Sequence, residues 1–195
     1  ANSQAIVPWL KPEPGKYYID SCAGAGGKSL HLASLTNDKA EIMSLDIRQS
    51  KLNILKKRAL RNRIKSIRTK FLKSQDEIND IKGNADGLLI DAPCSGLGVL
   101  KRNPETKWLI NEKQIKEIVL VQENILLTYS KLVKEGGFLV YATCSIFPVE
   151  NRNQIEKFLK TDQGLKFQFD VDKTYFSHNS GFDGFYCARL VKKCE

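Results

Sequence analysis

Two of the five cysteines follow short apolar segments that are typical of buried strands. Cys94 lies in the run Asp91-Ala-Pro-Cys94-Ser-Gly after residues 86–91, and Cys144 lies in Thr-Cys144-Ser after residues 137–143. Turn residues flank both thiols, whereas a structural cysteine is ordinarily packed among apolar side chains. We therefore expect two reactive thiols at the edge of a sheet. The other three cysteines are interpreted chiefly as packing residues: Cys22, Cys187 and Cys194.

Thiols beside a carboxyl group could modify a pyrimidine. Carbon 5 of a pyrimidine is a poor nucleophile, and addition of a thiolate at carbon 6 activates it before a later elimination releases the thiol. Protonation of ring nitrogen 3 during the addition requires an acid, and Asp91 is placed to serve. A second thiol close to the first could help the adduct to break down.

A glycine-rich turn follows the first predicted strand. The run Cys22-Ala-Gly-Ala-Gly-Gly-Lys28-Ser has no glycine at position 22, as a P-loop requires, and none at position 29, as the dinucleotide fingerprint requires. Both mismatches weaken an assignment as a nucleoside triphosphatase or a dehydrogenase. A tight turn that lets a ligand approach the backbone and a purely structural turn both stay open. Asp46, at the end of the second predicted strand, could bind a ribose or favour the start of the next helix.

The order of the elements around these groups predicts an α/β fold. Strands are predicted at 17–21, 41–46, 66–71, 86–91 and 137–143, and helices at 28–36, 48–62, 75–82, 112–134 and 149–160. Alternating strands and helices require crossover connections, hence a parallel sheet with helices on both faces. Two later segments, 166–171 and 184–191, have no helix between them and predict an antiparallel pair at one sheet edge. Ligands of such sheets bind outside the carboxyl ends of the strands.

The composition predicts one basic domain over residues 1–195. The chain carries 31 basic and 22 acidic side chains, a net charge of +9, and 42% hydrophobic residues, which suffice for a core. No apolar stretch reaches the length of a membrane span, so no membrane partner is expected. Five widely spaced cysteines and two histidines predict neither a disulfide framework nor a metal site.

The excess positive charge is local. Residues 48–73 contain eleven Lys or Arg and no acidic residue. A helix over 48–62 is expected to bury one face and to surround it with basic side chains; the predicted buried face comprises Leu52, Leu55, Ala59 and Leu60. A polyanionic partner such as a nucleic acid and a merely solvated helix face are equally compatible with this pattern.

Taken together, the motifs resemble the RsmB-like (Fmu/Sun) RNA cytosine-5 methyltransferases. The resemblance extends from near Ser3 to near Lys192, and Asp-Ala-Pro-Cys followed by Thr-Cys-Ser in one chain is rare outside that family. The runs that carry it are Cys22-Ala-Gly-Ala-Gly-Gly-Lys28-Ser, Asp91-Ala-Pro-Cys94-Ser-Gly, Arg102-Asn-Pro104 with Lys107-Trp108, Tyr141-Ala-Thr-Cys144-Ser with Glu150-Asn151, and Asp183-Gly-Phe-Tyr-Cys-Ala-Arg-Leu190.

The resemblance implies a Rossmann-like, S-adenosylmethionine-dependent methyltransferase fold with seven strands, mostly parallel, the last one antiparallel. It implies methylation of carbon 5 of a cytosine in RNA, with ribosomal RNA as the expected partner and the cytoplasm as the expected location. Cys144 would attack carbon 6, Cys94 would assist release and Asp91 would complete the catalytic set. In DNA cytosine-5 methyltransferases the Pro-Cys thiol attacks instead. An RNA-binding module that keeps the fold without turnover is the alternative function.

The resemblance also implies a cofactor site. Asp46 would contact the ribose, and Asp76 would contact the adenine, because the family's Asp near the end of the third strand is replaced by Leu72. The family usually has Ala-Pro at the position of Gly24-Ala25, which predicts a looser turn here. Residues 95–111 would shape the target-base side. Full-length bacterial members carry an additional N-terminal RNA-binding region, so the chain is expected to be the catalytic domain of a longer protein. The implied cofactor-binding residues are Cys22, Ala23, Gly24, Ala25, Gly26, Gly27, Lys28, Asp46, Asp76 and Asp91.

Overall fold

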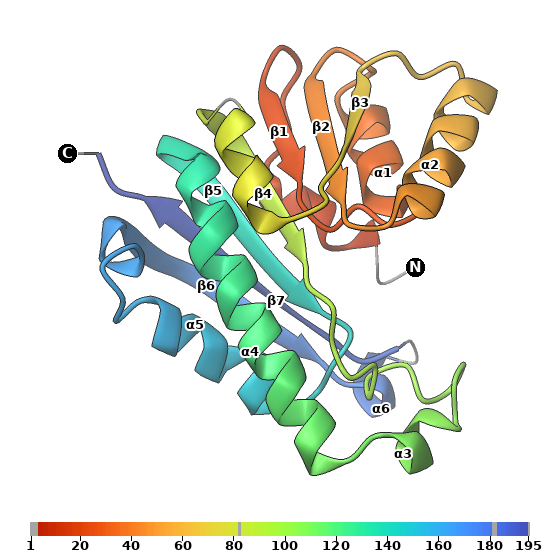
Figure 1. Ribbon diagram of the computed structural model, residues 1–195, viewed down its shortest axis with the longest axis vertical. Helices are drawn as coiled ribbons and strands as arrows, with labels where there is room; N and C mark the ends of the chain where they lie inside the picture. Colours follow the sequence, from red (N-terminus) through yellow and green to blue (C-terminus); the bar gives the residue numbers. More distant parts are fainter. Residues whose placement is uncertain (1–3, 82, 181–182, 195) are drawn as a thin grey trace.

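The computed structural model describes residues 4–81, 83–180 and 183–194 (Figure 1). A single seven-stranded sheet has the order β3-β2-β1-β4-β5-β7-β6. Every pair is parallel except the two made by β7, which lies antiparallel between β5 and β6. The predicted α/β class, the mostly parallel sheet and the antiparallel terminal pair are therefore confirmed. The strands are β1 (Tyr17–Asp20), β2 (Glu41–Asp46), β3 (Ile67–Phe71), β4 (Ala85–Asp91), β5 (Val133–Thr143), β6 (Phe167–Tyr175) and β7 (Phe185–Lys192).

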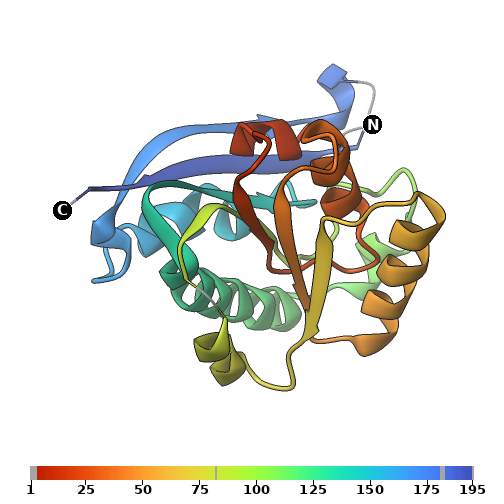
Figure 2. The same ribbon diagram turned by 90° about the horizontal axis from the view of Figure 1, so that it is seen from above.

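Helices cover both faces of the sheet (Figure 2). The α-helices are α1 (Gly27–Leu35), α2 (Gln49–Arg61), α3 (Thr106–Leu109), α4 (Glu112–Tyr129), α5 (Arg152–Phe158) and α6 (Ser177–Ser180). The 3-10 helices are η2 (Val7–Leu10), η3 (Gln75–Asp80), η4 (Ser130–Leu132), η5 (Pro148–Glu150) and η6 (Gly164–Lys166). Helices α4 and α5 pack on one face, and η2 and α1 pack on the other.

The two-sided burial explains why the central strands are apolar without alternation. In β4, Leu88 and Ile90 join the core beneath α4, whereas Leu89 joins the core beneath α1. All three side chains are fully buried. A strand covered on both faces needs apolar residues at successive positions, and this is the pattern that its sequence has.

The topology places the functional edge between β1 and β4. The chain leaves β1 for β2 and β3 at one side and then returns to β4, which pairs with the other side of β1. The carboxyl ends of β1 and β4 therefore diverge into loops that run in opposite directions, the arrangement that opens a crevice in doubly wound sheets. The glycine-rich turn follows β1, Asp91 ends β4, and Cys144 follows β5.

Several predicted boundaries are wrong. The helix predicted at 112–134 ends at Tyr129, and a 3-10 turn leads directly into β5, which starts at Val133 instead of residue 137. The added residues form an irregular start of β5, where Gly136 has a φ of +70°. The helix predicted at 75–82 is the 3-10 helix η3, and that predicted at 149–160 is split into η5 and α5.

Helix α2 shows where a periodicity argument overreaches. Leu52, Leu55 and Ala59 are buried as predicted, but Leu60 is 81% exposed. At about 100° per residue, Leu60 lies at the margin of the apolar stripe and turns away from the sheet. The buried face of α2 packs against Ala23 in the glycine-rich turn, so the basic helix directly supports the predicted cofactor site.

Candidate active site

The thiols of Cys94 and Cys144 meet at the carboxyl edge of the sheet. Their sulfur atoms are 3.0 Å apart, and the backbone N–H of Cys144 donates to the Cys94 sulfur at 3.3 Å. Both residues are partly buried, and neither is in a disulfide. The prediction that the two thiols converge, although fifty residues separate them in the chain, is confirmed.

The paired thiols differ in acidity. The hydrogen bond with Cys94 lowers the pKa of the Cys144 thiol, which burial and the charge of Asp91 would raise; the cation of Lys28 adds to the lowering. The same hydrogen bond, together with burial, raises the pKa of Cys94. The two sulfurs thus share a proton, and the cation of Lys28 favours the thiolate form that a nucleophile at Cys144 would need.

Lys28 and Asp91 form an ion pair next to the thiols. The Lys28 ammonium donates to Asp91 Oδ2 and links the start of α1 to the end of β4. Burial would lower the pKa of Lys28, but the charge of Asp91 and the hydrogen bond to it outweigh burial and raise the pKa. The Asp91 carboxylate is 33% exposed, whereas Lys28 is 14% exposed. The pair thus places the Lys28 ammonium, with its N–H donors, at the site.

Three hydrogen bonds hold the glycine-rich turn in place. The N–H of Gly24 donates to Asp46 Oδ2 at 2.8 Å, and the N–H of Gly26 donates to the Ala23 carbonyl at 2.9 Å. The carbonyl of Ala25 accepts a 2.7 Å hydrogen bond from Arg58 of α2. Gly24 has a φ of +53°, a conformation that glycine adopts without strain. The turn is thus held by its neighbours where the family's Ala-Pro is absent.

A cavity of about 670 Å³ lies over the turn and reaches the thiols. Most of the predicted site residues line it, and the additional lining comes chiefly from the start of the loop after β2 and from an apolar strip on α4. Its lining comprises Ser21, Cys22, Ala23, Gly24, Ala25, Gly27, Lys28, Asp46, Ile47, Arg48, Asp91, Ala92, Pro93, Cys94, Val121, Ile125, Tyr129 and Cys144. Sequence reasoning missed the α4 strip, because a helical apolar stripe gives no sign of which part of it faces a cavity.

The cavity fits a nucleoside cofactor with a charged tail. At Gly24 and Gly27 the position of a side chain would meet no atom within 4 Å, so the backbone is open to a ligand there. Asp46 is 6% exposed and receives the N–H groups of Gly24 and Arg48. Each carboxylate oxygen keeps a second lone pair that can accept from ribose hydroxyls.

Two of the predicted cofactor-binding residues, Gly26 and Asp76, are not among the described residues that line the cavity. Gly26, with a φ of +82°, faces α2, where a Cβ would overlap Leu55 Cγ and lie 2.8 Å from its Cδ1. Its role is to let the turn pack closely on α2. Asp76 lies in η3, and its side chain falls outside the described part of the structure.

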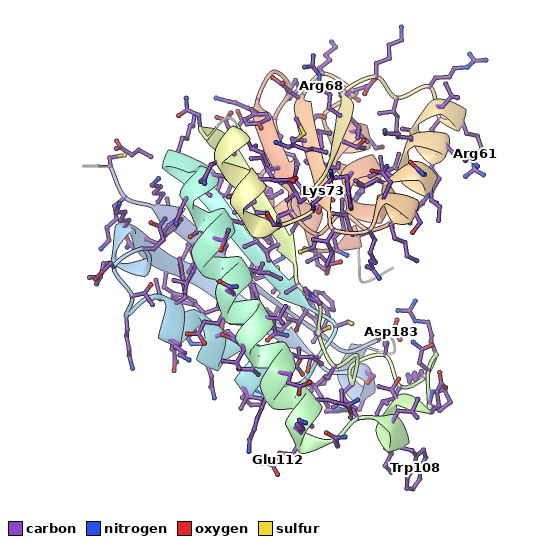
Figure 3. The ribbon with its side chains drawn as sticks, viewed as in Figure 1. Arg61, Arg68, Lys73, Trp108, Glu112 and Asp183 are labelled. Carbon is purple, nitrogen blue, oxygen red and sulfur yellow. The ribbon has the colours of Figure 1, made fainter. Side chains whose placement is uncertain are left out.

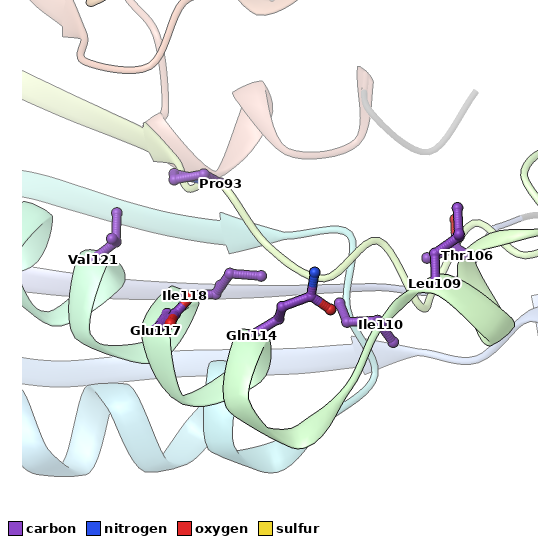
Figure 4. Close-up of a pocket in the computed structure, with 8 residues that line it drawn as sticks. All are labelled: Pro93, Thr106, Leu109, Ile110, Gln114, Glu117, Ile118 and Val121. Atoms are coloured by element: carbon purple, nitrogen blue, oxygen red, sulfur yellow. The ribbon is translucent and has the colours of Figure 1, made fainter.

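A second cavity, of about 440 Å³, adjoins the first and shares Pro93 and Val121 with it (Figure 4). Its walls are α3, the start of α4 and the loop between them: Pro93, Thr106, Leu109, Ile110, Gln114, Glu117, Ile118 and Val121. Trp108, which precedes the lining residue Leu109 in α3, is 83% exposed, and the ammonium of Lys107 lies 5.4 Å from the indole ring centroid.

A family model described as 16S rRNA methyltransferase RsmB/F matches residues 7–191. The chain belongs to this family. Methyltransferases of the family use S-adenosylmethionine. The match covers the sheet, the glycine-rich turn and both thiol loops.

Two curated relatives agree with the family assignment. The chain is 34% identical to ribosomal RNA small subunit methyltransferase B of Pectobacterium carotovorum and 35% identical to that of an Enterobacter species. These alignments cover 98% and 99% of this chain but 46% of each relative. The chain thus spans about half the length of the curated relatives it matches.

Solved structures show the same architecture. The crystal structure of PH0851 has a TM-score of 0.91 at 31% identity and covers 97% of this chain and 45% of that one. That of NSun6 from Pyrococcus horikoshii with SFG, an analogue of S-adenosylmethionine, has a TM-score of 0.89 at 24% identity over 99% of this chain and 52% of that one. The Rossmann-like methyltransferase fold implied by the sequence motifs is confirmed.

Neither a metal-binding cluster nor a membrane-spanning helix is found in the described part of the chain. Among the described residues, no group of three or more His, Cys, Asp or Glu is arranged to hold a metal ion. In the same residues, none of the helices has both the length and the apolar character needed to cross a bilayer.

Proposed function

We propose that this chain is a methyltransferase catalytic domain that methylates carbon 5 of a cytosine in ribosomal RNA in the cytoplasm, with S-adenosylmethionine as the methyl donor. The observation that carries the proposal is the contact of two thiols, 3.0 Å apart, on the wall of a cavity that also contains the Lys28–Asp91 pair. The family assignment supports ribosomal RNA as the substrate.

The residues of the large cavity would hold the cofactor. The open backbone at Gly24 and Gly27 would approach the methionine part, with the first N–H groups of α1 favouring its carboxylate. Asp46 would accept from the ribose, and Ile125 would pack against an apolar face of the ligand. When bound, the cofactor supplies an electrophilic methyl group.

Cys144 would supply the nucleophile. Its thiolate donates an electron pair to carbon 6 of the cytosine, the carbon 5–carbon 6 double bond opens, and ring nitrogen 3 takes a proton. Carbon 5 would then take the methyl group, whose bond to the sulfonium sulfur of the cofactor breaks and leaves a neutral thioether. Cys94 or a water molecule would accept the proton from carbon 5, the carbon 6–sulfur bond would break, and the double bond and the Cys144 thiolate would be restored as nitrogen 3 returns its proton.

The other polar groups of the site would transfer the protons that the addition and the elimination require. We assign the proton for nitrogen 3 to the Lys28–Asp91 pair instead of to Asp91 alone, because Lys28 carries the proton that the two share. Cys94 would take part in the final elimination. The hydrogen bond between the sulfurs supports this role, because it places a second proton-exchanging group beside the carbon 6–sulfur bond.

RNA would approach across the mouth of the cavities. In Figure 3, Arg61, Arg68 and Lys73 lie on the half of the molecule that contains α2 and β3, and Trp108 lies on α3 in the other half. Basic side chains neutralise phosphates, and an exposed aromatic ring stacks on an unpaired base. The second cavity beside Trp108 is consistent with the predicted target-base side of residues 95–111. The cytosine must be unstacked to reach Cys144.

The test is to incubate the protein with ribosomal RNA and S-adenosylmethionine and to measure 5-methylcytidine by mass spectrometry of the digested nucleosides. The proposal predicts this nucleoside with the unaltered protein and none with Cys144→Ala. RNA binding without any methylated nucleoside would favour the alternative of a binding module. A different methylated nucleoside would overturn the assignment to carbon 5.

A further inference from the structure

Glu150 is fully buried, yet its carboxylate joins the two thiol loops. Oε2 accepts from the backbone N–H of Ser95 at 2.8 Å, and Oε1 accepts from the Ser95 hydroxyl at 2.5 Å. Oε1 also accepts from the hydroxyl of Ser145. Ser95 directly follows Cys94, and Ser145 directly follows Cys144. One side chain therefore holds the residues next to both sulfurs.

Helix α4 completes this cluster. Gln122 Nε2 donates to Glu150 Oε2 at 3.1 Å and to the carbonyl of Pro93 at 3.0 Å. Pro93 precedes Cys94, so both neighbours of that thiol are fixed. The backbone carbonyl of Glu150 in turn accepts from the hydroxyl of Tyr141 in β5 at 2.7 Å. Four donors occupy the roughly four lone-pair sites that a carboxylate offers.

Glu150 acts on the thiols through their neighbours and not through direct contact. Glu150 touches neither sulfur, and it is absent from the lining of both cavities. A buried carboxylate is costly unless its oxygens are satisfied, and here four donors satisfy them. Three of these donors belong to Ser95 and Ser145, in the two loops that must stay in register for the thiols to meet.

We propose that Glu150 is a positioning residue whose length sets the distance between the Cys94 and Cys144 sulfurs. The consequence for methyl transfer rests on the proposed function, whereas the consequence for thiol spacing does not. The sequence motif contains Glu150, but spacing along the chain gives no sign that it reaches Ser95, which is 55 residues away.

Two substitutions separate the effect of the length of the Glu150 side chain from the effect of its charge. Glu150→Asp keeps the carboxylate but is one methylene shorter, so it cannot hold Ser95 and Ser145 together. Glu150→Gln keeps the length, and its amide nitrogen can donate to the two hydroxyls while its oxygen accepts from the Ser95 N–H. Glu156→Asp is the matched control, because Glu156 lies on α5 and pairs with the exposed Arg152, away from the thiol loops.

Thiol spacing can be read without any methyl transfer. Phenylarsine oxide bridges two close thiols, forming two arsenic–sulfur bonds and releasing one water, and mass spectrometry of the intact protein counts the adduct. We expect one bridged arsenical on the unaltered protein, on Glu150→Gln and on Glu156→Asp. Glu150→Asp should bind it at least tenfold more weakly, and Cys94→Ala should lose it.

Kinetics give the second readout. Glu150→Asp should lower kcat by about 100-fold, the effect of a misplacement of about 1 Å at reacting groups. The KM values for RNA and for S-adenosylmethionine should stay unchanged, because Glu150 contacts neither ligand site. Circular dichroism establishes that each variant is folded. If Glu150→Asp does not fold, the double change Ser95→Ala with Ser145→Ala removes two of the donors and should weaken arsenical binding likewise.

Equal behaviour of Glu150→Asp and Glu150→Gln, whether both bridge the arsenical or neither does, would overturn the proposal. If the arsenical distinguishes the two variants as expected but the unaltered protein forms no 5-methylcytidine, the positioning role stands and the proposed function fails.

Discussion

Substitution of Gly26 tests how the sequence builds the cofactor site. Gly26 has a φ of +82°, and a Cβ there would overlap the side chain of Leu55, which is fully buried in α2. Gly26→Ala therefore has two costs, a strained backbone and a clash in the core. Gly15 offers a matched control, because its φ is +79° and a Cβ there would meet no atom within 4 Å.

The two costs can be given magnitudes. An alanine in the left-handed region costs about 1–2 kcal/mol, and this applies to Gly15→Ala and Gly26→Ala alike. Overpacking at a well-packed site adds about 1–3 kcal/mol, and this applies to Gly26→Ala alone. The effect of an alanine on the unfolded chain cancels in the comparison. Gly26→Ala should thus lower the free energy of unfolding by about 1–3 kcal/mol more than Gly15→Ala.

The assay combines urea unfolding with calorimetric titration of S-adenosylmethionine. Relief of the clash moves the turn away from α2 and breaks its contacts with Asp46 and Arg58, so we expect Gly26→Ala to bind the cofactor at least about tenfold more weakly, or 1.4 kcal/mol. Gly15→Ala should bind it normally. Equal loss of stability in the two variants, or unchanged cofactor binding by Gly26→Ala, would refute the packing argument.

The remaining predictions concern release, RNA binding and pH. Cys94→Ala should accumulate a covalent protein–RNA adduct, seen as a slow band on a denaturing gel; the absence of such a band would remove the release role. Loss of three exposed cations of α2 should flatten the dependence of RNA affinity on salt by about two units of slope, as measured by fluorescence anisotropy; the changes are Lys56→Ala, Lys57→Ala and Arg61→Ala. An unchanged slope would identify a merely solvated face. Burial raises the pKa of Asp20 to about 6, so the folded chain binds more protons than the unfolded chain between about pH 4 and 6, and stability falls as the pH rises through that range. Asp20→Asn should remove this slope from urea unfolding measured between pH 4 and 7, and a slope that persists would contradict the assignment.

Local patterns in the sequence were sufficient to predict the strands and the mostly parallel class of the sheet, but not the order of its strands. Strand ends carry punctuating residues, so the positions of Asp46 and Asp91 at the carboxyl edge followed from chain order and the crossover rule. Boundaries were less predictable where tertiary pairing decides them. Val133 extends β5 because it pairs with Ala85 of β4, a contact that no local pattern records.

The site was predictable only in part, for a similar reason. The convergence of Cys94 and Cys144 followed from topology, since both come after neighbouring strands. The Lys28–Asp91 pair and the contacts of Glu150 depend on side chains that meet across elements. Periodicity assigns such residues to a face but does not identify their partners, as the exposure of Leu60 also illustrates.

Identification of the residue that attacks the cytosine tests the central claim most directly. RNA containing 5-fluorocytosine cannot lose a proton from carbon 5 after methyl transfer, so the adduct persists and its peptide can be sequenced by mass spectrometry. The account predicts that, in the presence of S-adenosylmethionine, the RNA is attached to Cys144, and that Cys144→Ala forms no adduct. Attachment to Cys94, or an adduct that persists in Cys144→Ala, would contradict it.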